Sequence, residues 1–244
     1  MAIYLKKFEN HTQYENYING SDAILPNVSI CTTEDDVHYN PSTPPTPSHD
    51  YVEIGGIKWA TMNVGANSIT DGGLYFQWGD TQGYTAAQVG VDKNFEGSDY
   101  QYYDDGSYTK YNAADELITL QPSDDAVTAA WGGNWRTPTM SELQALVEAV
   151  NTGWTTDYQG SGVSGLVMTD KTDTSKVLFF PAVGYADYGS VHDIGSYGNY
   201  WSSSVSNDSE DYQTYTMYFD VNSGWGDTID SRYYGLSVRG VLDE

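Results

Sequence analysis

The sequence predicts an α+β domain with short antiparallel strands, two helices and long irregular loops. Strand-like runs come first, two helix signals follow near the middle of the chain, and many short strand-like runs fill the remainder. This order differs from the regular alternation of strands and helices that builds a parallel sheet. Aromatic residues make up 14% of the 244 residues, so large side chains are available to fill a sizeable core.

A small α+β segment is expected to precede this domain. Residues 1–40 contain a strand-like alternation over 2–8, helical spacing over 12–18 and a hairpin pattern within 27–39. So short a segment can hardly hold a stable core alone. We therefore expect an assembly or attachment unit that docks on a partner, on the main domain or on copies of itself. The Pro-rich residues 41–50 are predicted to form an extended linker.

The main domain is predicted to span residues 51–244 and to begin with a hairpin. Residues 51–54 and 57–60 read as two strands joined by a tight turn at Gly55-Gly56. An apolar and aromatic run over 73–80 is another predicted strand, and residues 81–121 are predicted to form long loops.

Two helices are predicted after these loops. Ser123 is expected to cap a short helix over residues 124–130. A capping box at Thr139 and Glu142 predicts a second helix, whose apolar residues recur at helical spacing through Val150. A hairpin over 165–181 is expected to follow.

The run from Ala186 to Tyr234 is the candidate binding region. Tyr, Ser, Asp, Gly and Asn occupy 32 of its 49 positions, a composition that ordinarily indicates disorder. Its eight tyrosines and the strand-like runs 200–203 and 215–221 favour a folded structure instead. Antibody loops use the same residues, because Tyr provides a rigid contact and Ser, Gly and Asn provide adaptable hydrogen bonds. The run therefore predicts a binding surface on a rigid frame, closed by a final strand over 236–241.

Strand alternation divides this region into core and surface residues. Tyr200, Trp201 and Phe219 are predicted to lie inside. Tyr188, Tyr197, Tyr212 and Tyr233 are predicted to be exposed. The candidate ligand-binding residues are Asp187, Tyr188, Ser190, His192, Asp193, Tyr197, Asn199, Asp208, Asp211, Tyr212, Tyr215, Asn222, Trp225, Asp227, Asp230, Arg232 and Tyr233.

The charge of the chain excludes several classes of partner. A net charge of −24 repels phosphate backbones and anionic membranes, so we expect no nucleic acid and no membrane insertion. Solubility explains this acidity most simply, and binding of cations or sugar hydroxyls by Asp-rich loops is the alternative. The single cysteine, Cys31, leaves no pair for an internal disulfide. No run is apolar and long enough for a signal peptide or a membrane span.

The residues also indicate a non-enzymatic protein without a cofactor. Four scattered histidines and no nucleophile-elbow pattern give no reason to expect catalytic residues. No EF-hand spacing occurs, so no metal site is predicted, although a structural calcium ion in the Asp-rich loops stays an alternative. Arg136 and Arg239 are expected to be buried or partly buried ion-pair partners that hold loops, whereas Arg232 is a candidate for ligand contact.

Six ordered segments carry a resemblance to a known family. They are Trp59–Asn63, Gly73–Tyr75, Trp131–Thr139, Phe180–Tyr185, Tyr200–Ser204 and Gly235–Arg239. With them, residues 51–242 resemble the Fibrobacter succinogenes major paralogous domain. The resemblance implies a C-type-lectin-like fold related to the formylglycine-generating enzymes. Those enzymes need active-site cysteines, which residues 51–244 lack.

One departure from the family pattern is informative. Members often carry one cysteine before the Trp-Arg pair and another after the final Val-Arg. Here Trp131 and Gly240 stand in those places, so we expect a large–small pair instead of a disulfide. The triplets Glu-Pro-Asn, Gln-Pro-Asp and Trp-Asn-Asp of sugar-binding C-type lectins are absent.

More narrowly, the chain resembles the variable proteins of diversity-generating retroelements. These proteins display a hypervariable ligand-binding surface whose codons change at adenines. Residues 187–197 contain only types reachable from an Asn codon, whereas Trp225 is not reachable and is expected to be framework. The N-terminal segment and its linker resemble leaders on gut bacteriophage proteins.

This resemblance implies a phage or cell-surface adhesin, located on a virion tail or an extracellular surface. Its expected partner is a protein or glycan receptor on a bacterial cell, bound by a homo-oligomer that forms through the N-terminal segment. The alternative is a fixed-specificity glycan-binding module or a structural virion or surface module.

Overall fold

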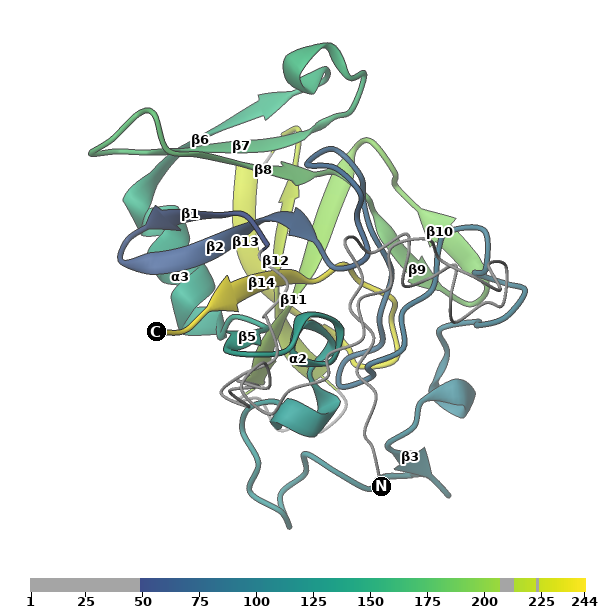
Figure 1. The fold of residues 1–244 in the computed structure, drawn as a ribbon. Helices are drawn as coiled ribbons and strands as arrows, with labels where there is room; N and C mark the ends of the chain where they lie inside the picture. Colours follow the sequence, from purple (N-terminus) through teal and green to yellow (C-terminus); the bar gives the residue numbers. More distant parts are fainter. Residues whose placement is uncertain (1–48, 207–212, 223) are drawn as a thin grey trace, which may run out of the picture. The chain divides into compact units, whose positions relative to one another are not determined.

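The computed structural model describes residues 49–206, 213–222 and 224–244. The predicted N-terminal segment and most of the linker lie outside the described residues, as do the candidate site residues Asp208, Asp211 and Tyr212. The described residues form several small antiparallel sheets and two short α-helices, connected by long loops (Figure 1). The prediction of an α+β domain is confirmed at this level.

The first sheet joins the two ends of the domain. Its strand order is β1-β2-β14-β5, so the last strand pairs with the predicted first hairpin. Gly55 and Gly56 both have positive φ, at 62° and 77°, which the tight hairpin turn requires. The four strands are β1 (Tyr51–Ile54), β2 (Ile57–Asn63), β14 (Arg239–Leu242) and β5 (Trp135–Arg136).

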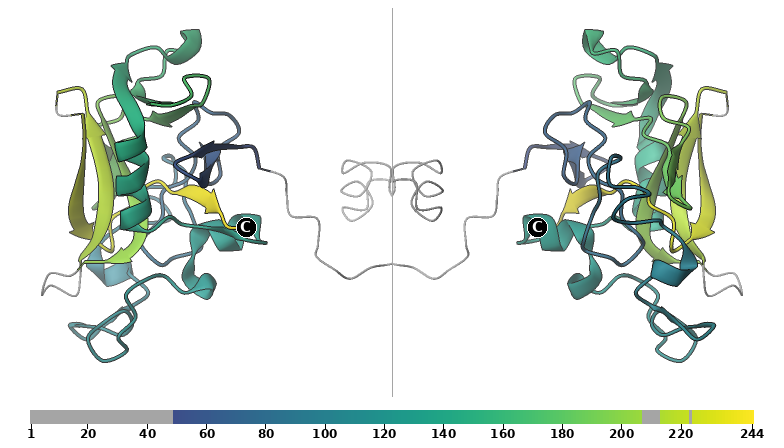
Figure 2. Two further views of the ribbon diagram at one scale, coloured as in Figure 1. Left: turned by 90° about the vertical axis from the view of Figure 1, so that its left-hand side faces the viewer. Right: turned by 90° about the vertical axis from the view of Figure 1, so that its right-hand side faces the viewer.

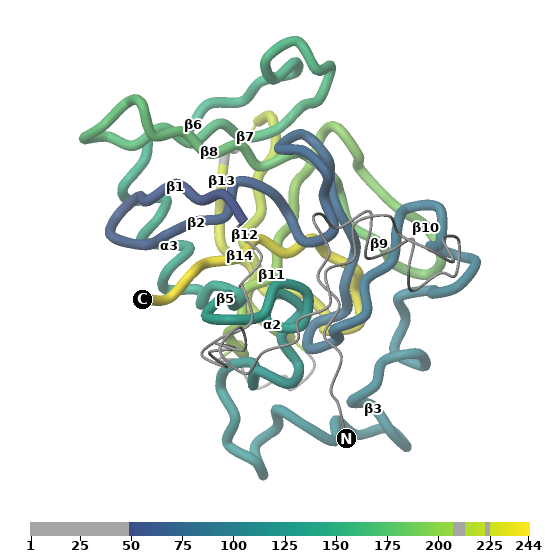
Figure 3. The backbone as a smooth tube through the Cα atoms, viewed as in Figure 1, coloured from purple at the N-terminus to yellow at the C-terminus, as the bar shows by residue number. Residues whose placement is uncertain are grey.

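A long stretch between β2 and the helices runs mostly as loops, which confirms the prediction for residues 81–121 (Figure 3). It contains only the short elements η2 (Gly97–Asp99), β3 (Tyr103–Asp104), β4 (Ser107–Tyr108) and η3 (Pro122–Asp124). The predicted strand over 73–80 appears as isolated bridges, in which Phe76 pairs with Leu236. Phe76 and Trp78 are buried and anchor these loops to the core.

The first helix begins later than predicted. Helix α2 (Ala126–Trp131) is capped by Asp125, whose carboxylate accepts hydrogen bonds from the backbone N–H groups of Val127 and Thr128. Ser123 cannot be the cap because it lies inside the 3₁₀ turn η3. The predicted cap was therefore wrong by two residues.

The second helix follows its prediction closely. In α3 (Met140–Ala149), Thr139 accepts a hydrogen bond from the Glu142 N–H at 3.3 Å, and Glu142 accepts one from the Thr139 N–H at 2.8 Å. This is the predicted capping box. Leu143, Leu146 and Val147 are buried on one side of the helix. Val150 leaves the helix and begins a strand instead.

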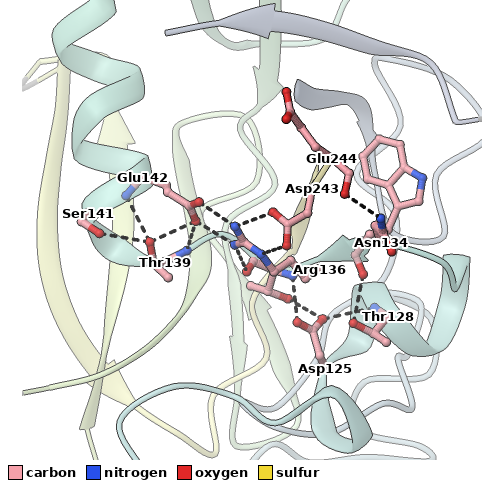
Figure 4. Close-up of polar contacts among 11 residues, drawn as sticks. Asp125, Thr128, Asn134, Arg136, Thr139, Ser141, Glu142, Asp243 and Glu244 are labelled. Atoms are coloured by element: carbon pink, nitrogen blue, oxygen red, sulfur yellow. Dashed lines mark hydrogen bonds and ion pairs between the residues drawn. The ribbon is translucent and has the colours of Figure 1, made fainter. Parts of the chain in front are cut away.

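Arg136 ties the start of α3 to the end of the chain (Figure 4). Its guanidinium donates to both carboxylate oxygens of Glu142, at 2.7 and 2.8 Å, and to both of Asp243 at 2.8 Å. The prediction of a partly buried ion-pair partner is confirmed. These hydrogen bonds raise the pKa of Arg136, with Glu142 contributing most.

A second sheet follows α3. It contains the predicted hairpin together with a strand that was not predicted, and its order is β6-β7-β8. Its strands are β6 (Val150–Thr155), β7 (Gly165–Asp170) and β8 (Val177–Pro181), and the short η4 (Tyr158–Gly160) lies between β6 and β7.

The third sheet carries the polar region and has α3 against one of its faces (Figure 2). Its order is β11-β12-β13, with β11 (Tyr197–Val205), β12 (Gln213–Asp220) and β13 (Gly224–Ser231). Tyr200, Met217 and Phe219 are buried and share one core cluster with the apolar residues of α3. Trp201 is buried in a second cluster with Trp78 and Trp135. The prediction that Tyr200, Trp201 and Phe219 lie inside is confirmed.

Arg239 is buried in the core, 1% exposed, as predicted. Its partners differ from the prediction, because all those in the described residues are neutral oxygens. It donates to Asn63 Oδ1, to the Ala60 carbonyl and to the Phe179 carbonyl, at 2.9, 2.9 and 3.0 Å. Burial lowers the pKa of Arg239 to about 10. The guanidinium therefore fastens β14 to β2 and β8 without a carboxylate.

The expected large–small pair is present. A methyl group on Gly240 would lie 2.4 Å from Trp131 Cζ3 and 2.8 Å from Val127 Cγ1. Replacing Gly240 with alanine is therefore expected to lower the free energy of unfolding by about 2 kcal/mol, because the packed indole leaves no space. Urea unfolding measures this change.

Gly153→Ala provides the control for this substitution. Gly153 also lies in a strand, and no atom lies within 4 Å of the position of its added Cβ. We expect a change within about 0.5 kcal/mol there. Equal effects of the two substitutions would contradict tight packing between Gly240 and Trp131.

Candidate functional site

A short hairpin that the sequence analysis missed presents several candidate residues. Strands β9 (Tyr185–Asp187) and β10 (Ser190–His192) pair around a two-residue turn. Tyr188 and Gly189 in this turn have φ of 40° and 74°, as the favoured hairpin turns require. Tyr188 is 64% exposed, and Ser190 is also exposed. The hairpin therefore projects an aromatic side chain from the domain.

A polar contact between His192 and Asp187 fastens the base of the hairpin. His192 Nε2 lies 2.6 Å from Asp187 Oδ1, and the imidazole stacks on the ring of Tyr185 with centroids 5.2 Å apart. The candidate residues His192 and Asp187 thus contact each other across the two strands of the hairpin. The imidazole thereby holds the ring of Tyr185, which lies 6.2 Å from the ring of Tyr197 in β11.

Six tyrosines form a continuous row of contacting rings, which we call the tyrosine chain. Neighbouring ring centroids lie 5.2–6.5 Å apart. All six side chains are exposed or half-buried. In order the chain is Tyr188, Tyr233, Tyr234, Tyr185, Tyr197 and Tyr218. Aromatic rings at these spacings attract one another, so each ring helps to hold its neighbours in place. The row is therefore a preorganised surface.

Beside the tyrosine chain lies a polar hollow of about 320 Å³. Its lining consists of Tyr185, Asp193, Tyr197, Asn199, Asp230 and Tyr234. Five different segments supply these residues: strand β9, the turn after β10, strand β11, strand β13 and the segment after β13. Four of the six were predicted as site residues.

The floor of the hollow is held by hydrogen bonds across the sheet. Asp230 Oδ2 accepts from Asn199 Nδ2 at 2.8 Å and from Thr216 Oγ1 at 3.0 Å. Asn199 is only 2% exposed, and within the described residues its Oδ1 has no hydrogen-bond donor. The carboxylate of Asp230 is thus fixed in position, and a buried acceptor beside it lacks a partner.

The tyrosines of the hollow are held in the neutral form. Burial, together with Tyr233, Asp187 and Asp230, raises the pKa of Tyr234 to about 12. Burial, and then Asp230, raises the pKa of Tyr197. Burial and three nearby aspartates likewise raise the pKa of Tyr185. The carboxylates therefore carry the charge of this site, and the phenols remain neutral at ordinary pH.

Strand alternation places three other predicted residues on the opposite face of the sheet. Trp225 pairs with Phe219 and Asp227 with Met217, so both turn toward α3 with the core residues. Asp227 accepts a hydrogen bond from Gln144 of α3 at 2.9 Å. Tyr215 and Trp225 pack against the core cluster. These three residues belong to the α3 side, not to the hollow.

Arg232 is also not part of the surface, because its side chain is 0% exposed. Its guanidinium lies over the rings of Trp78 and Tyr108, 5.2 and 5.4 Å from their centroids. It donates to the Lys110 carbonyl at 3.3 Å. The side chain therefore stabilises the long loops from inside, and the prediction of ligand contact is wrong for this residue.

Two predicted site residues remain, and one of them belongs to the tyrosine chain. Asn222 lies in the turn between β12 and β13, outside the lining of the hollow. Tyr233 is half-buried and belongs to the tyrosine chain. Tyr218 was missed, although it alternates with the buried Met217 and Phe219. Tyr185 and Tyr234 were missed because Tyr185 ends the framework segment Phe180–Tyr185 and Tyr234 directly precedes Gly235–Arg239.

Two features are absent from the described residues. Within residues 49–206, 213–222 and 224–244, no three His, Cys, Asp or Glu side chains are grouped so that they could hold a metal ion. In the same part of the chain, no helix has the length and apolar character to cross a membrane.

Comparison with known proteins gives one partial match. A family model described as a domain of unknown function (DUF8237) matches residues 167–240. No curated protein and no solved structure matches the chain. The matched range extends from β7 into β14, and it contains all six residues that line the hollow.

Proposed function

We propose that this chain is a non-enzymatic binding protein that captures a receptor on a bacterial cell through the tyrosine chain and the adjoining hollow. The observation that carries the proposal is the division of one sheet into two chemically different faces. Tyr200, Met217 and Phe219 enter the core, whereas Tyr197, Asn199 and Asp230 line an open hollow. Clustered aromatic rings rimmed by polar groups are typical of protein-binding surfaces.

The scaffold in this proposal is a C-type-lectin-like fold. The segments that carry the resemblance lie mainly in the buried framework, where Trp59, Trp135, Phe180 and Arg239 are all nearly inaccessible. Apart from Tyr185, which ends the segment Phe180–Tyr185, the residues of the hollow and of the exposed end of the hairpin lie between these segments in the sequence. This distribution supports a framework that stays constant while the surface residues differ between variants, as a diversity-generating retroelement would produce.

The proposed location is a virion tail or an extracellular surface. An N-terminal segment that assembles several copies would add avidity to weak single-site contacts. A fixed-specificity glycan-binding module and a structural virion or surface module are the rival functions.

Flow cytometry with the labelled full chain tests the proposal. The chain is expected to bind a subset of bacterial strains from the community that carries the gene. Tyr234→Ser, at the hollow, is expected to reduce binding about tenfold, since tyrosines in such surfaces contribute more than 1 kcal/mol each. Tyr215→Ser, on the α3 side, is the matched control and is expected to retain binding, with thermal unfolding confirming that both variants fold.

The outcomes separate the three functions. Binding that is lost after protease treatment of the cells supports a protein receptor. Binding that survives protease and is lost after periodate oxidation of the cell surface supports the glycan-binding alternative. Failure to bind any strain contradicts the proposal and favours a structural module.

A further inference from the structure

We propose that the hollow of this chain selects a positively charged side chain, arginine or lysine, on its protein ligand. The inference rests on the proposed binding function and specifies the chemistry that this version of the surface recognises. Three features of the hollow point to a cation: an excess of hydrogen-bond acceptors, aromatic walls and a negative electrostatic field.

The hollow is rich in acceptors that lack donors. No described residue donates to the carboxylate of Asp193, to Oδ1 of Asp230 or to Oδ1 of Asn199. Asn199 is buried, and a buried acceptor without a donor is unfavourable. The amide nitrogen of Asn199 is already engaged by Asp230. A ligand that supplies several N–H groups would therefore satisfy this site.

The walls of the hollow are suited to a cation. The ring of Tyr185 lies 6.2 Å from that of Tyr197 and 6.0 Å from that of Tyr234. A guanidinium or an ammonium group is attracted to the face of such rings within about 6 Å of the centroid. The aliphatic part of an arginine or lysine side chain would pack against the same rings.

The charges around the hollow act in the same direction. Asp193 and Asp230 line the hollow. Asp187 also lies near it: burial is the largest cause that raises the pKa of Tyr185, and Asp187, Asp193 and Asp230 add to it. No lysine or arginine is among the six described residues of the lining. A cation entering the hollow would therefore be stabilised, and an anion would be repelled.

A sugar fits these groups less well. Sugar hydroxyls need acceptors and donors, yet the side-chain donors that the lining leaves are the three phenol groups and one N–H of the buried Asn199, whose other N–H already donates to Asp230. A guanidinium offers five N–H donors and no acceptor, which matches the acceptors of the hollow. The observations therefore favour a cationic side chain on a protein.

An NMR titration of the ¹⁵N-labelled full chain tests this inference. Nα-acetyl-arginine amide is the probe, and Nα-acetyl-citrulline amide is a neutral control of nearly the same shape. The arginine probe is expected to shift the amide signals of the six lining residues in a saturable way. The citrulline probe is expected to bind about tenfold more weakly, because it loses the charge.

Two variants locate the binding. Asp193→Asn removes one carboxylate of the hollow. The backbone of Asp193 has a positive φ of 58°, which asparagine also tolerates. The substitution is expected to weaken binding of the arginine probe about fivefold. Asp227→Asn makes the same charge change on the α3 side of the sheet and is expected to leave the affinity unchanged. Equal losses in both variants would show that only the overall charge attracts the probe, and would overturn the inference.

Other outcomes are equally decisive. Equal affinity for the arginine and citrulline probes overturns the inference, as does saturable binding of methyl glycosides at the hollow in place of the arginine probe. Cell binding that depends on Tyr234, without binding of the arginine probe, would overturn the cation specificity and leave the proposed function standing. Binding of the probe without binding of any cell would overturn the proposed function alone.

Discussion

Replacing Arg239 with methionine is expected to lower the free energy of unfolding by about 4 kcal/mol. The methionine fills part of the space but offers no donor, so Asn63 Oδ1 and the carbonyls of Ala60 and Phe179 lose their partner in the core. Each buried acceptor left without a donor costs about 1–3 kcal/mol. The guanidinium also lies 4.3 Å from the ring centroid of Phe180, and this contact is lost as well.

Arg136→Met is the matched control for this prediction. Its side chain is partly exposed, and its partners Glu142 and Asp243 both retain contact with solvent. The same substitution is therefore expected to cost only about 1 kcal/mol there. Urea unfolding of the two variants makes the comparison. A smaller loss for Arg239→Met than for Arg136→Met would contradict the structural role that we assign to Arg239.

Asp125→Ala is expected to lower the free energy of unfolding by about 3 kcal/mol. Asp125 is 3% exposed and caps α2. Its carboxylate also accepts hydrogen bonds from the N–H and the hydroxyl of Thr137, both at 2.8 Å. Loss of a cap costs about 1 kcal/mol, and the donors of Thr137 left in a buried site add the remainder.

Two further variants sharpen this test by thermal or urea unfolding. Asp125→Asn keeps an oxygen for the cap but places an amide group opposite the N–H of Thr137, so an intermediate loss of about 1.5 kcal/mol is expected. Ser123→Ala removes the hydroxyl that was predicted to be the cap. Ser123 is exposed and its hydroxyl makes one hydrogen bond, to Asp124 Oδ1 at 2.9 Å, so the expected cost is no more than about 1 kcal/mol. A larger loss for Ser123→Ala than for Asp125→Ala would restore the original assignment.

Local signals in the sequence were sufficient to predict several structural elements. The Gly55-Gly56 turn and the Thr139–Glu142 capping box are short-range patterns whose geometry depends on few neighbours. Residue type was sufficient to place Tyr200 and Phe219 in the core, because large aromatic side chains in strand-like runs supply much of the buried surface of a domain.

Nonlocal packing explains what the sequence analysis missed. Arg232 lies in a polar run, and only the three-dimensional fold brings Trp78 and Tyr108 under its guanidinium. The placement of Asp227 depends on the register between β12 and β13, which composition does not specify. The hollow itself depends on Tyr185 and Asp230, which are 45 positions apart in the sequence.

Sequencing the codons of residues 186–234 across a natural population tests the central claim most directly. Our account predicts substitutions at adenines, concentrated at positions of the exposed turn and the hollow such as Tyr188, Asp193 and Tyr197. The core positions of the same strands, such as Met217 and Phe219, are predicted to stay unchanged. An invariant stretch would contradict a diversified binding surface, and equal variation at core and surface positions would contradict the division of the sheet into a framework face and a binding face.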